Sequence, residues 1–469
     1  MTPPSTPSSP ALAVPASFRD PDGRVLFWKG SYWRGVTPGG CGSLDKLTTS
    51  GLYQHLTERR WLLPHTETDR ATSQALGFHR ALLPEQLEFT SFPSEWCHSQ
   101  LRAAALRTLA IQEAALHRGM CMADASAFNI QFHRGDTVLI DTLSLKNWDG
   151  SPVWDAYRQF CRHFLAPLAL GSYRRLRPGK LGSKLEGPTL ETASRLLPWR
   201  SWLRPGLMVH LHLHARASSL GRQGNRAKPI STSPTSARRT MEGLAISLRR
   251  AVESLTWKPQ TSQWSDYYGS THGAGADYAA RKRSEVRHCL EAIQPARVLD
   301  TGANTGEFAR LAQELGATTV ACDADVECVE RLFKRMPPPL GSPLLPLVID
   351  LTEPTPALGW NCEERASFSD RVRADATLAL ALVHHLCITG GIPVERLPDF
   401  FSPMSPHLII EWVGLEDPLA QKIASPRGGN YPTYSQAAFV NAFSQRYEIL
   451  RQVCLTDRDR TLYWMRRRN

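Results

Sequence analysis

The segment Val298-Leu-Asp-Thr-Gly-Ala-Asn-Thr-Gly-Glu-Phe308 decides the fold of the C-terminal part of the chain. It passes from apolar residues typical of a buried strand, through a turn that contains two glycines, to the start of a helix. Gly302 allows the backbone to approach a ligand without a Cβ in the way, and Gly306 lets the helix begin close to the sheet. Because a purely structural strand-to-helix turn uses the same glycines, the segment has to be interpreted with the sequence around it.

Strands and helices alternate from this segment to the end of the chain. Strands are predicted over 297–299, 319–322, 347–349, 376–381, 407–412, 447–453 and 461–465, and the first two helices over 307–315 and 326–336. This alternation predicts an α/β domain over residues 263–469 in which a parallel sheet carries helices on both faces. The last two strands are expected to form an antiparallel hairpin at the edge of that sheet.

Three acidic residues near the glycine turn bear on which cofactor it would bind. Asp323 ends the second predicted strand, where a carboxylate accepts hydrogen bonds from ribose hydroxyls in nucleotide-binding folds. Nicotinamide enzymes share that feature, but here Asp300 opens the loop and Glu307 begins the helix. A carboxylate at Asp300 would repel a pyrophosphate near a helix N-terminus, whereas it suits the amino group of a sulfonium amino acid. The pattern therefore favours S-adenosylmethionine.

This segment resembles the first motif of the class I S-adenosylmethionine-dependent methyltransferases, D/E-x-G-x-G-x-G, with Asn304 in place of the middle glycine. The resemblance implies a Rossmann-like, seven-stranded methyltransferase sheet with S-adenosylmethionine as the cofactor. It places Asp300 and Gly302 at the methionine end, Asp323 at the ribose and Asp350 near the adenine. The cofactor-binding residues that it implies are Asp300, Gly302, Asn304, Gly306, Asp323, Asp350 and Asp375.

Three residues near the ends of the fourth and fifth strands are candidate catalytic groups. His384 and His385 follow the strand predicted over 376–381, and Glu411 ends the strand predicted over 407–412. Open α/β sheets place their chemistry at the carboxyl ends of their strands, and either imidazole could act as a general base. The alternatives are that a histidine only packs against the following helix and that Glu411 is a satisfied structural acceptor. Methyl transfer to a nucleophilic acceptor needs alignment more than acid–base help.

Two polar, aromatic segments flank the predicted site. Trp264-Ser-Asp-Tyr-Tyr268 and Asp277-Tyr-Ala-Ala-Arg-Lys282 precede the sheet and could either cover the cofactor as a lid or pack against the first helix. The turn-rich loop Ser425–Tyr434 could contact a substrate or simply connect two elements.

The N-terminal half predicts an α+β domain over residues 21–210. A hairpin turns at Gly30-Ser31, helices are predicted near 52–63 and 100–117, and a second hairpin joins the strands 129–132 and 137–140. In that second region the spacing of Asp124, Asn129 and Asp141 is similar to that of the catalytic Asp, the metal-binding Asn and the second metal-binding Asp of protein kinases. The resemblance implies a kinase-like fold in which these three residues could hold a nucleotide and its metal.

The kinase-like pattern departs from that of working phosphotransferases. Met122 stands where a histidine usually precedes the loop, Thr142 follows Asp141, and no glycine-rich phosphate loop is evident near Gly30. Lys29 or Lys46 could supply the phosphate-binding lysine, but nothing in the spacing selects either. We therefore expect a degenerate domain that binds substrate or a partner, with a satisfied hairpin network as the alternative.

Motifs from both halves together resemble one methyltransferase family. Similar segments are Phe89-Thr-Ser-Phe-Pro-Ser-Glu-Trp96, Ala123-Asp-Ala-Ser-Ala-Phe-Asn129, Trp154-Asp-Ala-Tyr-Arg-Gln-Phe-Cys161, Asn304-Thr-Gly306 and the His384-His385 pair. They resemble the family that includes rhizobial host-specific nodulation proteins, over about residues 80–170 and 263–469. That resemblance implies methyl transfer without naming an acceptor.

Composition sets the outer limits. The chain has 469 residues, 42% of them hydrophobic and 21% charged, which is typical of a globular protein with two domains. A disordered tail is expected over 1–20, and a basic linker with a connecting helix over 211–262. No apolar run reaches the roughly 18 residues of a membrane span, and no signal peptide is evident. Ten scattered cysteines predict reduced thiols in the cytoplasm and no metal site.

The leading hypothesis is S-adenosylmethionine-dependent methylation of a small molecule, a glycan or another acceptor, which the N-terminal domain helps to select. One alternative is an ATP-binding or phosphotransferase module with a regulatory Rossmann-like domain. Another is a non-catalytic scaffold. The formal charge of +11 also suggests an RNA methyltransferase, although the excess is concentrated in 174–184 and 216–239 and no nucleic-acid-binding motif accompanies it.

Overall fold

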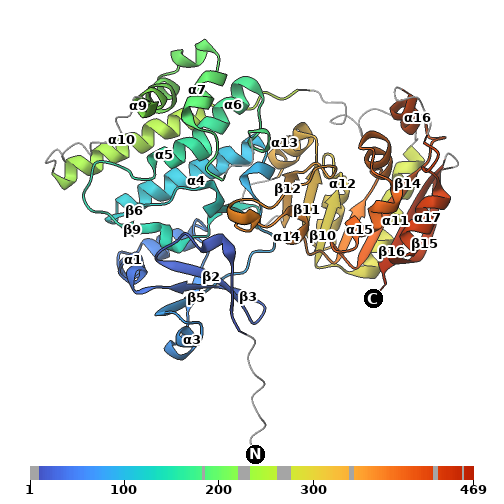
Figure 1. Cartoon of the computed structure of the whole chain (residues 1–469), viewed down its shortest axis with the longest axis horizontal. Helices are drawn as coiled ribbons and strands as arrows, with labels where there is room; N and C mark the ends of the chain where they lie inside the picture. The colour runs from blue at the N-terminus through green and yellow to red at the C-terminus, as the bar shows by residue number, and fades with distance from the viewer. Residues whose placement is uncertain are drawn as a thin grey trace, which may run out of the picture. The chain divides into compact units, whose positions relative to one another are not determined.

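The computed structural model describes residues 10–181, 185–219, 233–260, 276–336, 343–425, 431–456 and 459–468. The chain divides into two compact units (Figure 1). Unit 1 comprises Met1–Ser94, His98–Trp257 and Ala357–Ala366, and unit 2 comprises Glu95–Cys97, Lys258–Pro356 and Ser367–Asn469.

Unit 2 is built on a seven-stranded mixed sheet. Its strands are β10 (Arg297–Thr301), β11 (Thr318–Asp323), β12 (Leu344–Val348), β13 (Ala376–Ala379), β14 (His407–Val413), β15 (Tyr447–Thr456) and β16 (Arg460–Arg467). They lie in the order β12-β11-β10-β13-β14-β16-β15, with the first five parallel and β16 antiparallel to both of its neighbours. Each predicted strand is present, and so is the predicted terminal hairpin.

The strand order of unit 2 reverses between β10 and β13. The chain runs outward from β10 to β11 and β12, then returns to β13 on the other side of β10. In open α/β sheets the loops after such strands leave a crevice at the carboxyl edge, where ligands bind. The topology thus points to the loops that follow β10, β11 and β13.

Helices cover both faces of this sheet. Glu411 and Trp412 point to opposite faces because successive strand residues alternate. Glu411 meets Tyr278 and Lys282 of α11 (Ala276–Ile293), whereas Trp412 packs on Phe439 of α17 (Gln436–Ser444).

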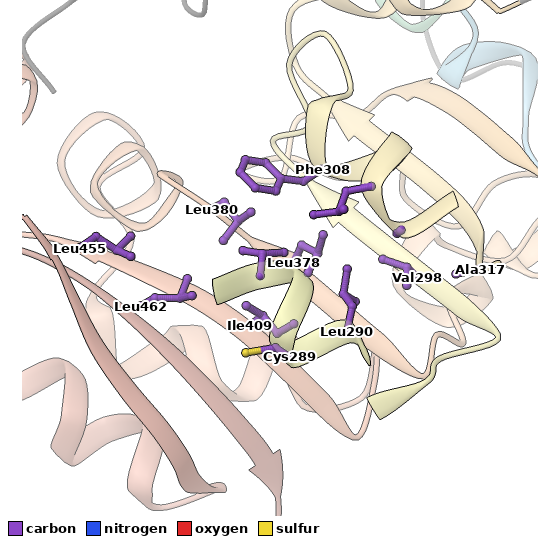
Figure 2. Close-up of a cluster of buried hydrophobic side chains, with 13 residues drawn as sticks. Cys289, Leu290, Val298, Phe308, Ala317, Leu378, Leu380, Ile409, Leu455 and Leu462 are labelled. Atoms are coloured by element: carbon purple, nitrogen blue, oxygen red, sulfur yellow. The ribbon is translucent and has the colours of Figure 1, made fainter. Parts of the chain in front are cut away.

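The core on the α11 face joins that helix to the sheet and to α12 (Glu307–Glu314). Figure 2 shows Cys289 and Leu290 of α11 beside Val298, Leu378 and other buried side chains. Such burial contributes roughly 25 cal/mol per Å² of apolar surface. The segment 277–282, for which a lid was one prediction, is therefore the first part of a packed helix, while Trp264–Tyr268 lies outside the described residues.

Unit 1 begins with a five-stranded antiparallel sheet in the order β1-β2-β3-β5-β4. Two short strand pairs, β6 with β9 and β7 with β8, follow the long buried helix α4. Their bounds are β1 (Leu12–Ala13), β2 (Gly23–Trp28), β3 (Ser31–Val36), β4 (His65–Glu67), β5 (Arg80–Pro84), α4 (His98–Leu116), β6 (Met120–Met122), β7 (Ile130–His133), β8 (Asp136–Leu139) and β9 (Leu145–Asn147). Both predicted hairpins and the helix near 100–117 are confirmed.

The remaining helices of unit 1 surround these strands. They are α1 (Pro38–Thr49), α2 (Leu52–Glu58), α3 (Arg70–Ala75), α5 (Tyr157–Phe160), α6 (Ala166–Arg174), α7 (Leu190–Leu196), α8 (Pro205–Leu207), α9 (His214–Ser219) and α10 (Pro234–Glu253). No helix among the described residues is both long and apolar enough to cross a bilayer.

Three predicted boundaries need correction. The tail expected over 1–20 already contains β1, which pairs with β2. The linker expected over 211–262 includes α10, which belongs to unit 1 because Ala237, Met241 and Ala245 recur at helical spacing and are buried. Residues 220–232 of that linker lie outside the described residues.

The third correction concerns the stretch Ala357–Ala366, which follows β12 in sequence yet belongs to unit 1. Its Glu364 is buried and pairs with Arg19 at 2.6 Å, and the Arg365 guanidinium donates to the carbonyl oxygen of Ala16. A buried carboxylate needs a cationic or hydrogen-bonding partner, and Arg19 supplies one from the other end of the chain.

Candidate functional site

The loop between β10 and α12 adopts the left-handed conformation at three positions. Gly302, Asn304 and Gly306 have φ angles of 78°, 52° and 84°. Asparagine tolerates this conformation better than most other residues, which explains how Asn304 replaces the glycine of the family motif. The amides of Gly302 and Ala303 both donate to the Cys322 carbonyl, at 2.8 and 2.9 Å, and hold the loop against the end of β11.

Gly306 lets the loop approach the next helix. A Cβ at this position would lie 2.6 Å from Cδ1 of Leu332, a buried residue of α13 (Val326–Lys334). A side chain at this position would overlap Leu332, so the contact between the loop and α13 requires glycine here.

Asp323 closes the loop from the end of β11. One of its carboxylate oxygens accepts the Asn304 amide at 2.7 Å and the other accepts the Asp325 amide at 2.8 Å. The side chain remains partly exposed. Burial raises its pKa to about 6, against the effect of these two amides.

Asp300 lies beneath the loop with only 3% of its surface exposed. Burial, followed by the negative charge of Asp323, raises the pKa of its carboxyl group to about 7, while Lys282 acts in the opposite direction. Burial is the first cause of both raised pKa values, so it disfavours the charged form of each carboxyl group. Such a site favours a ligand that carries positive charge.

Asp350 lies two residues beyond β12 at the same edge, since Val348 pairs with Asp323 in the sheet register. Its carboxylate accepts hydrogen bonds from the amide and the hydroxyl group of Thr352, at 2.9 and 2.6 Å. The structure thus brings six predicted residues to the carboxyl edge of three adjacent strands: Asp300, Gly302, Asn304, Gly306, Asp323 and Asp350.

The seventh predicted cofactor residue, Asp375, does not belong to this set. It precedes β13, so it lies at the amino edge of the parallel sheet, opposite the loop of Gly302. There its carboxylate accepts the Arg297 amide at 2.8 Å and pairs with the Arg297 guanidinium at 3.6 Å. A residue that begins a strand cannot reach a site at the carboxyl end of the same strand.

The two histidines lie beyond the carboxyl end of β13. Their ring centroids are 4.1 Å apart. His384 is buried, and its Nδ1 has no hydrogen-bond partner among the described residues, whereas His385 is partly exposed. Burial lowers the pKa of His384 well below its ordinary value and that of His385 to about 4. Both rings are therefore neutral near pH 7, suited to orienting an acceptor by hydrogen bonding and weak as bases.

Glu411 is fully buried in an ionic network. Its carboxylate pairs with Lys282 at 2.7 Å and with Arg460 at 3.1 Å. It also accepts the Tyr278 hydroxyl at 2.7 Å and the Ala381 amide at 2.9 Å. Burial alone would raise the pKa of Glu411, but the charges of Lys282 and Arg460 outweigh it and hold the pKa low. A carboxylate with these partners is no general base, so the structure contradicts the predicted catalytic role and supports the structural alternative.

The same network shows what the sequence did not reveal. Arg460 also binds Asp417 at 2.7 Å, and Lys282 contributes to the charge around Asp300. Ala381, which donates to Glu411, has a left-handed φ of 50° and lies between β13 and His384. The network therefore holds the loop that carries the histidines. The sequence signal for this network is Lys282, a lysine that stands among the apolar residues of α11.

The loop 425–434, which follows α16 (Pro418–Ala424), was expected either to contact a substrate or simply to connect two elements. Residues 426–430 lie outside the described residues, and Tyr434 is buried against Trp412 with its hydroxyl donating to the Val413 carbonyl at 2.6 Å. Tyr434 therefore anchors the loop to the core.

In unit 1 a backbone hydrogen bond places Asn129 opposite Ile140, the residue before Asp141. The Ile140 amide donates to the Asn129 carbonyl at 2.9 Å, and Asp141 pairs at 2.7 Å with Arg34 of β3. Asp124 instead accepts the Ser126 amide and the Gln159 side chain. Among the described residues, no three His, Cys, Asp or Glu side chains form a metal-binding group.

The cation that the structure pairs with Asp141 is an arginine rather than Lys29 or Lys46. Lys29 lies over the Trp28 ring, and the basic residue that reaches Asp141 is Arg34. Arg34 was not predicted, because the phosphate-binding residue of the kinase-like pattern is a lysine.

Comparison with known proteins gives one relative along the whole chain. The nodulation protein NoeA of Rhizobium meliloti (strain 1021) is 30% identical over 471 aligned residues, which cover 97% of this chain and 96% of that protein. No family model matches the chain.

Solved structures match with low scores. The N-methyltransferase NodS of Bradyrhizobium japonicum WM9 is 13% identical, covering 41% of this chain and 98% of its own, with a TM-score of 0.31. The magnesium protoporphyrin IX methyltransferase ChlM of Synechocystis PCC 6803, with bound SAM, is 15% identical over 43% of this chain and 86% of its own, with a TM-score of 0.30. The bifunctional kinase-methyltransferase WbdD is 18% identical over 46% of this chain and 45% of its own, with a TM-score of 0.31. Scores of this size assign neither fold nor activity.

Proposed function

The chain belongs to the family of the nodulation protein NoeA, and we propose that its unit 2 is a Rossmann-like class I methyltransferase domain that binds S-adenosylmethionine. The observation that carries this proposal is the arrangement at the carboxyl edge of β10 and β11. A left-handed loop at Gly302, Asn304 and Gly306 is closed by the Asp323 carboxylate, at the point where the strand order reverses.

The residues at this edge fit the cofactor. S-adenosylmethionine carries a sulfonium and an ammonium group, and the raised pKa values of Asp300 and Asp323 mark carboxyl groups that a cation would stabilise in their charged form. At Gly302 the φ of 78° favours glycine, and a Cβ there would lie 3.4 Å from the Leu382 side chain. In our proposal Asp300 and Gly302 face the methionine end, Asp323 accepts the ribose hydroxyls, and Asp350 lies near the adenine.

When bound, the cofactor supplies a methyl group on a sulfonium centre, which is a good leaving group. The protein then has to align the acceptor and exclude water. The partly exposed, neutral imidazole of His385 can hydrogen-bond a hydroxyl or amino group and hold it toward the loop after β10. Glu411, through the Ala381 amide, holds the histidine loop in place.

Hydroxyl and amino groups are the nucleophiles that sugars and small metabolites offer. We therefore propose a small-molecule or glycan acceptor, which unit 1 helps to select. Incubating the purified protein with labelled S-adenosylmethionine and candidate acceptors of the two classes should produce a labelled product, and less of it with His385→Ala.

Equilibrium dialysis with labelled S-adenosylmethionine tests the cofactor proposal. We expect saturable binding that S-adenosylhomocysteine displaces and that Asp323→Asn reduces at least tenfold. Asp375→Asn is the matched control, because Asp375 lies at the opposite edge and its substitution should leave affinity unchanged. Equal losses in both variants would contradict the proposed site.

A second candidate, nucleotide binding in unit 1, rests on the kinase-like spacing of Asp124, Asn129 and Asp141 and on the backbone hydrogen bond that joins Asn129 to Ile140. The Arg34 guanidinium already neutralises Asp141, which opposes binding of a metal ion there. We therefore rank a substrate- or partner-binding role for this kinase-like unit above phosphotransfer. Magnesium-dependent ATP binding that is lost in Asp141→Ala would reverse that order.

A further inference from the structure

Unit 1 exposes six large apolar side chains within residues 196–213, from the end of α7 to the end of the helical turn Met208–Leu213. Trp199 is 75% exposed and Leu203 is 69% exposed. The apolar surface, as we call it, consists of Leu196, Trp199, Leu203, Met208, Val209 and Leu213. Single exposed apolar residues are ordinary, but a cluster of this kind marks a surface that binds something.

The surface rests on a rigid base. The hydroxyl groups of Ser194 and Ser201 both hydrogen-bond the His212 ring, at 2.8 and 2.9 Å, and the Trp202 ring stacks on it at 4.2 Å. These contacts join α7, the turn Trp199–Leu203 and the turn Met208–Leu213 through their inner sides. The apolar side chains on their outer sides are therefore held in place while exposed to water.

Positive charge accompanies the apolar surface. Arg195, Arg200 and Arg204 are exposed within it, and the Arg174 guanidinium donates to the Leu196 carbonyl at 2.7 Å. The sequence contains no Asp or Glu between Glu191 and Glu242. The partner that complements this surface is thus apolar inside and negatively charged outside.

We propose that the apolar surface docks unit 1 on an anionic lipid bilayer. Transfer of tryptophan, leucine, methionine and valine side chains to the boundary between headgroups and acyl chains lowers their free energy, and arginines around them contact lipid phosphates. Nucleic acid is a poorer match, because its phosphate backbone offers nothing to exposed aliphatic side chains. Such docking is peripheral and needs no spanning helix.

Vesicle flotation tests the proposal with the full chain and without cofactor. We expect the protein to float with vesicles of phosphatidylcholine containing phosphatidylglycerol and to remain behind with phosphatidylcholine alone. Trp199→Ser should reduce binding at least tenfold. Arg200→Gln combined with Arg204→Gln should reduce binding roughly 30-fold if each arginine contacts one lipid phosphate. Folding of each variant is checked by circular dichroism.

Matched controls come from unit 1. Trp360→Ser removes a tryptophan that is 71% exposed elsewhere, and Arg59→Gln with Arg70→Gln removes two exposed arginines outside the surface. These variants should float like the wild type. Absence of flotation with anionic vesicles, equal losses in the control variants, or RNA binding that requires Trp199 while vesicle binding does not, would each overturn the proposal.

Discussion

At the level of single residues, the carboxyl groups of Asp300 and Asp323 dominate the candidate site. Their raised pKa values mean that the empty protein holds protons there which a cationic ligand would displace. Two measurable consequences follow for the dependence of stability and binding on pH.

The first concerns stability. Between about pH 4 and pH 7 the folded protein keeps the Asp300 proton that the unfolded chain releases, so the free energy of unfolding falls as pH rises through this window. Asp300→Asn cannot ionise and escapes this loss. We expect the variant to be more stable than the wild type at pH 8, by up to about 4 kcal/mol, and equally stable near pH 4. Urea denaturation at both pH values measures the difference, and a variant that is less stable at pH 8 would refute it.

The second concerns binding. Asp300 and Asp323 attract a cation only when they are deprotonated, at pH values above about 7 and 6. The affinity for S-adenosylmethionine should therefore rise between pH 5.5 and pH 8. For each proton that binding releases, the affinity should rise by about tenfold per pH unit. Isothermal titration at several pH values tests this, with proton release read from buffers of different ionisation enthalpy. A flat profile would count against carboxylate contacts to the ligand.

How far single residues could be predicted depends on how local their signal is. Gly302 and Gly306 were singled out because glycine permits close approaches in a strand-to-helix turn, and Asn304 because it replaces a glycine of the motif. The structure adds that all three have left-handed φ angles. Asp375 was expected to begin the fourth strand, and it does lie at the amino edge there, where the cofactor contact that the resemblance implied has no place. The roles of Lys282 and Arg460 went unpredicted since their partner Glu411 is distant in sequence from both.

At the level of elements, a buried ionic network fastens α11 to β14 and β16. We expect Lys282→Met to lower the free energy of unfolding by about 3–5 kcal/mol, because it leaves Glu411 short of one cation in a buried setting. Chemical denaturation measures this. Arg281→Met, which removes an exposed neighbour on the same helix, should change little. If Lys282→Met proved as stable as Arg281→Met, the network would not hold these elements together.

The loop between β10 and α12 makes a second prediction at this scale. Gly306→Ala combines a left-handed φ with a Cβ 2.6 Å from Leu332, whereas Gly316→Ala has a φ of 93° and no neighbour within 4 Å. We expect Gly306→Ala to cost about 1–3 kcal/mol more than Gly316→Ala, since only the first adds steric overlap. Equal losses would show that the loop relaxes away from α13.

Elements were predicted well where the hydrophobic period was regular. All seven strands of unit 2 and the hairpins of unit 1 have the expected places. The connecting helix predicted within the linker is present as α10, but its stripe of Ala237, Met241 and Ala245 is buried and the helix belongs to unit 1.

At the level of the whole molecule, the two compact units are not two successive stretches of chain. Residues 357–366 fold with unit 1 although they come between two strands of unit 2. They contact Arg19 and Ala16, which are far from them in sequence. Sequence periodicity cannot reveal that this segment belongs to unit 1, because the assignment depends on an ion pair between a buried carboxylate and an arginine hundreds of residues away.

The packing of residues 357–366 in unit 1 predicts a difference in proteolysis. In a fragment of residues 258–469 the Arg365 guanidinium lacks both the Ala16 carbonyl and the Phe128 ring that it covers at 4.8 Å. Trypsin should therefore cleave after Arg365 much faster in the fragment than in the full chain, as followed by mass spectrometry. Cleavage at the same rate in both would show that unit 1 does not hold this segment.

The most direct test of the central claim is calorimetric titration of S-adenosylmethionine, and separately of magnesium-ATP, into the full chain and into Asp323→Ala and Asp141→Ala. The proposed methyltransferase predicts saturable S-adenosylmethionine binding that is lost in Asp323→Ala and retained in Asp141→Ala. Absence of S-adenosylmethionine binding, together with ATP binding that depends on Asp141, would contradict it.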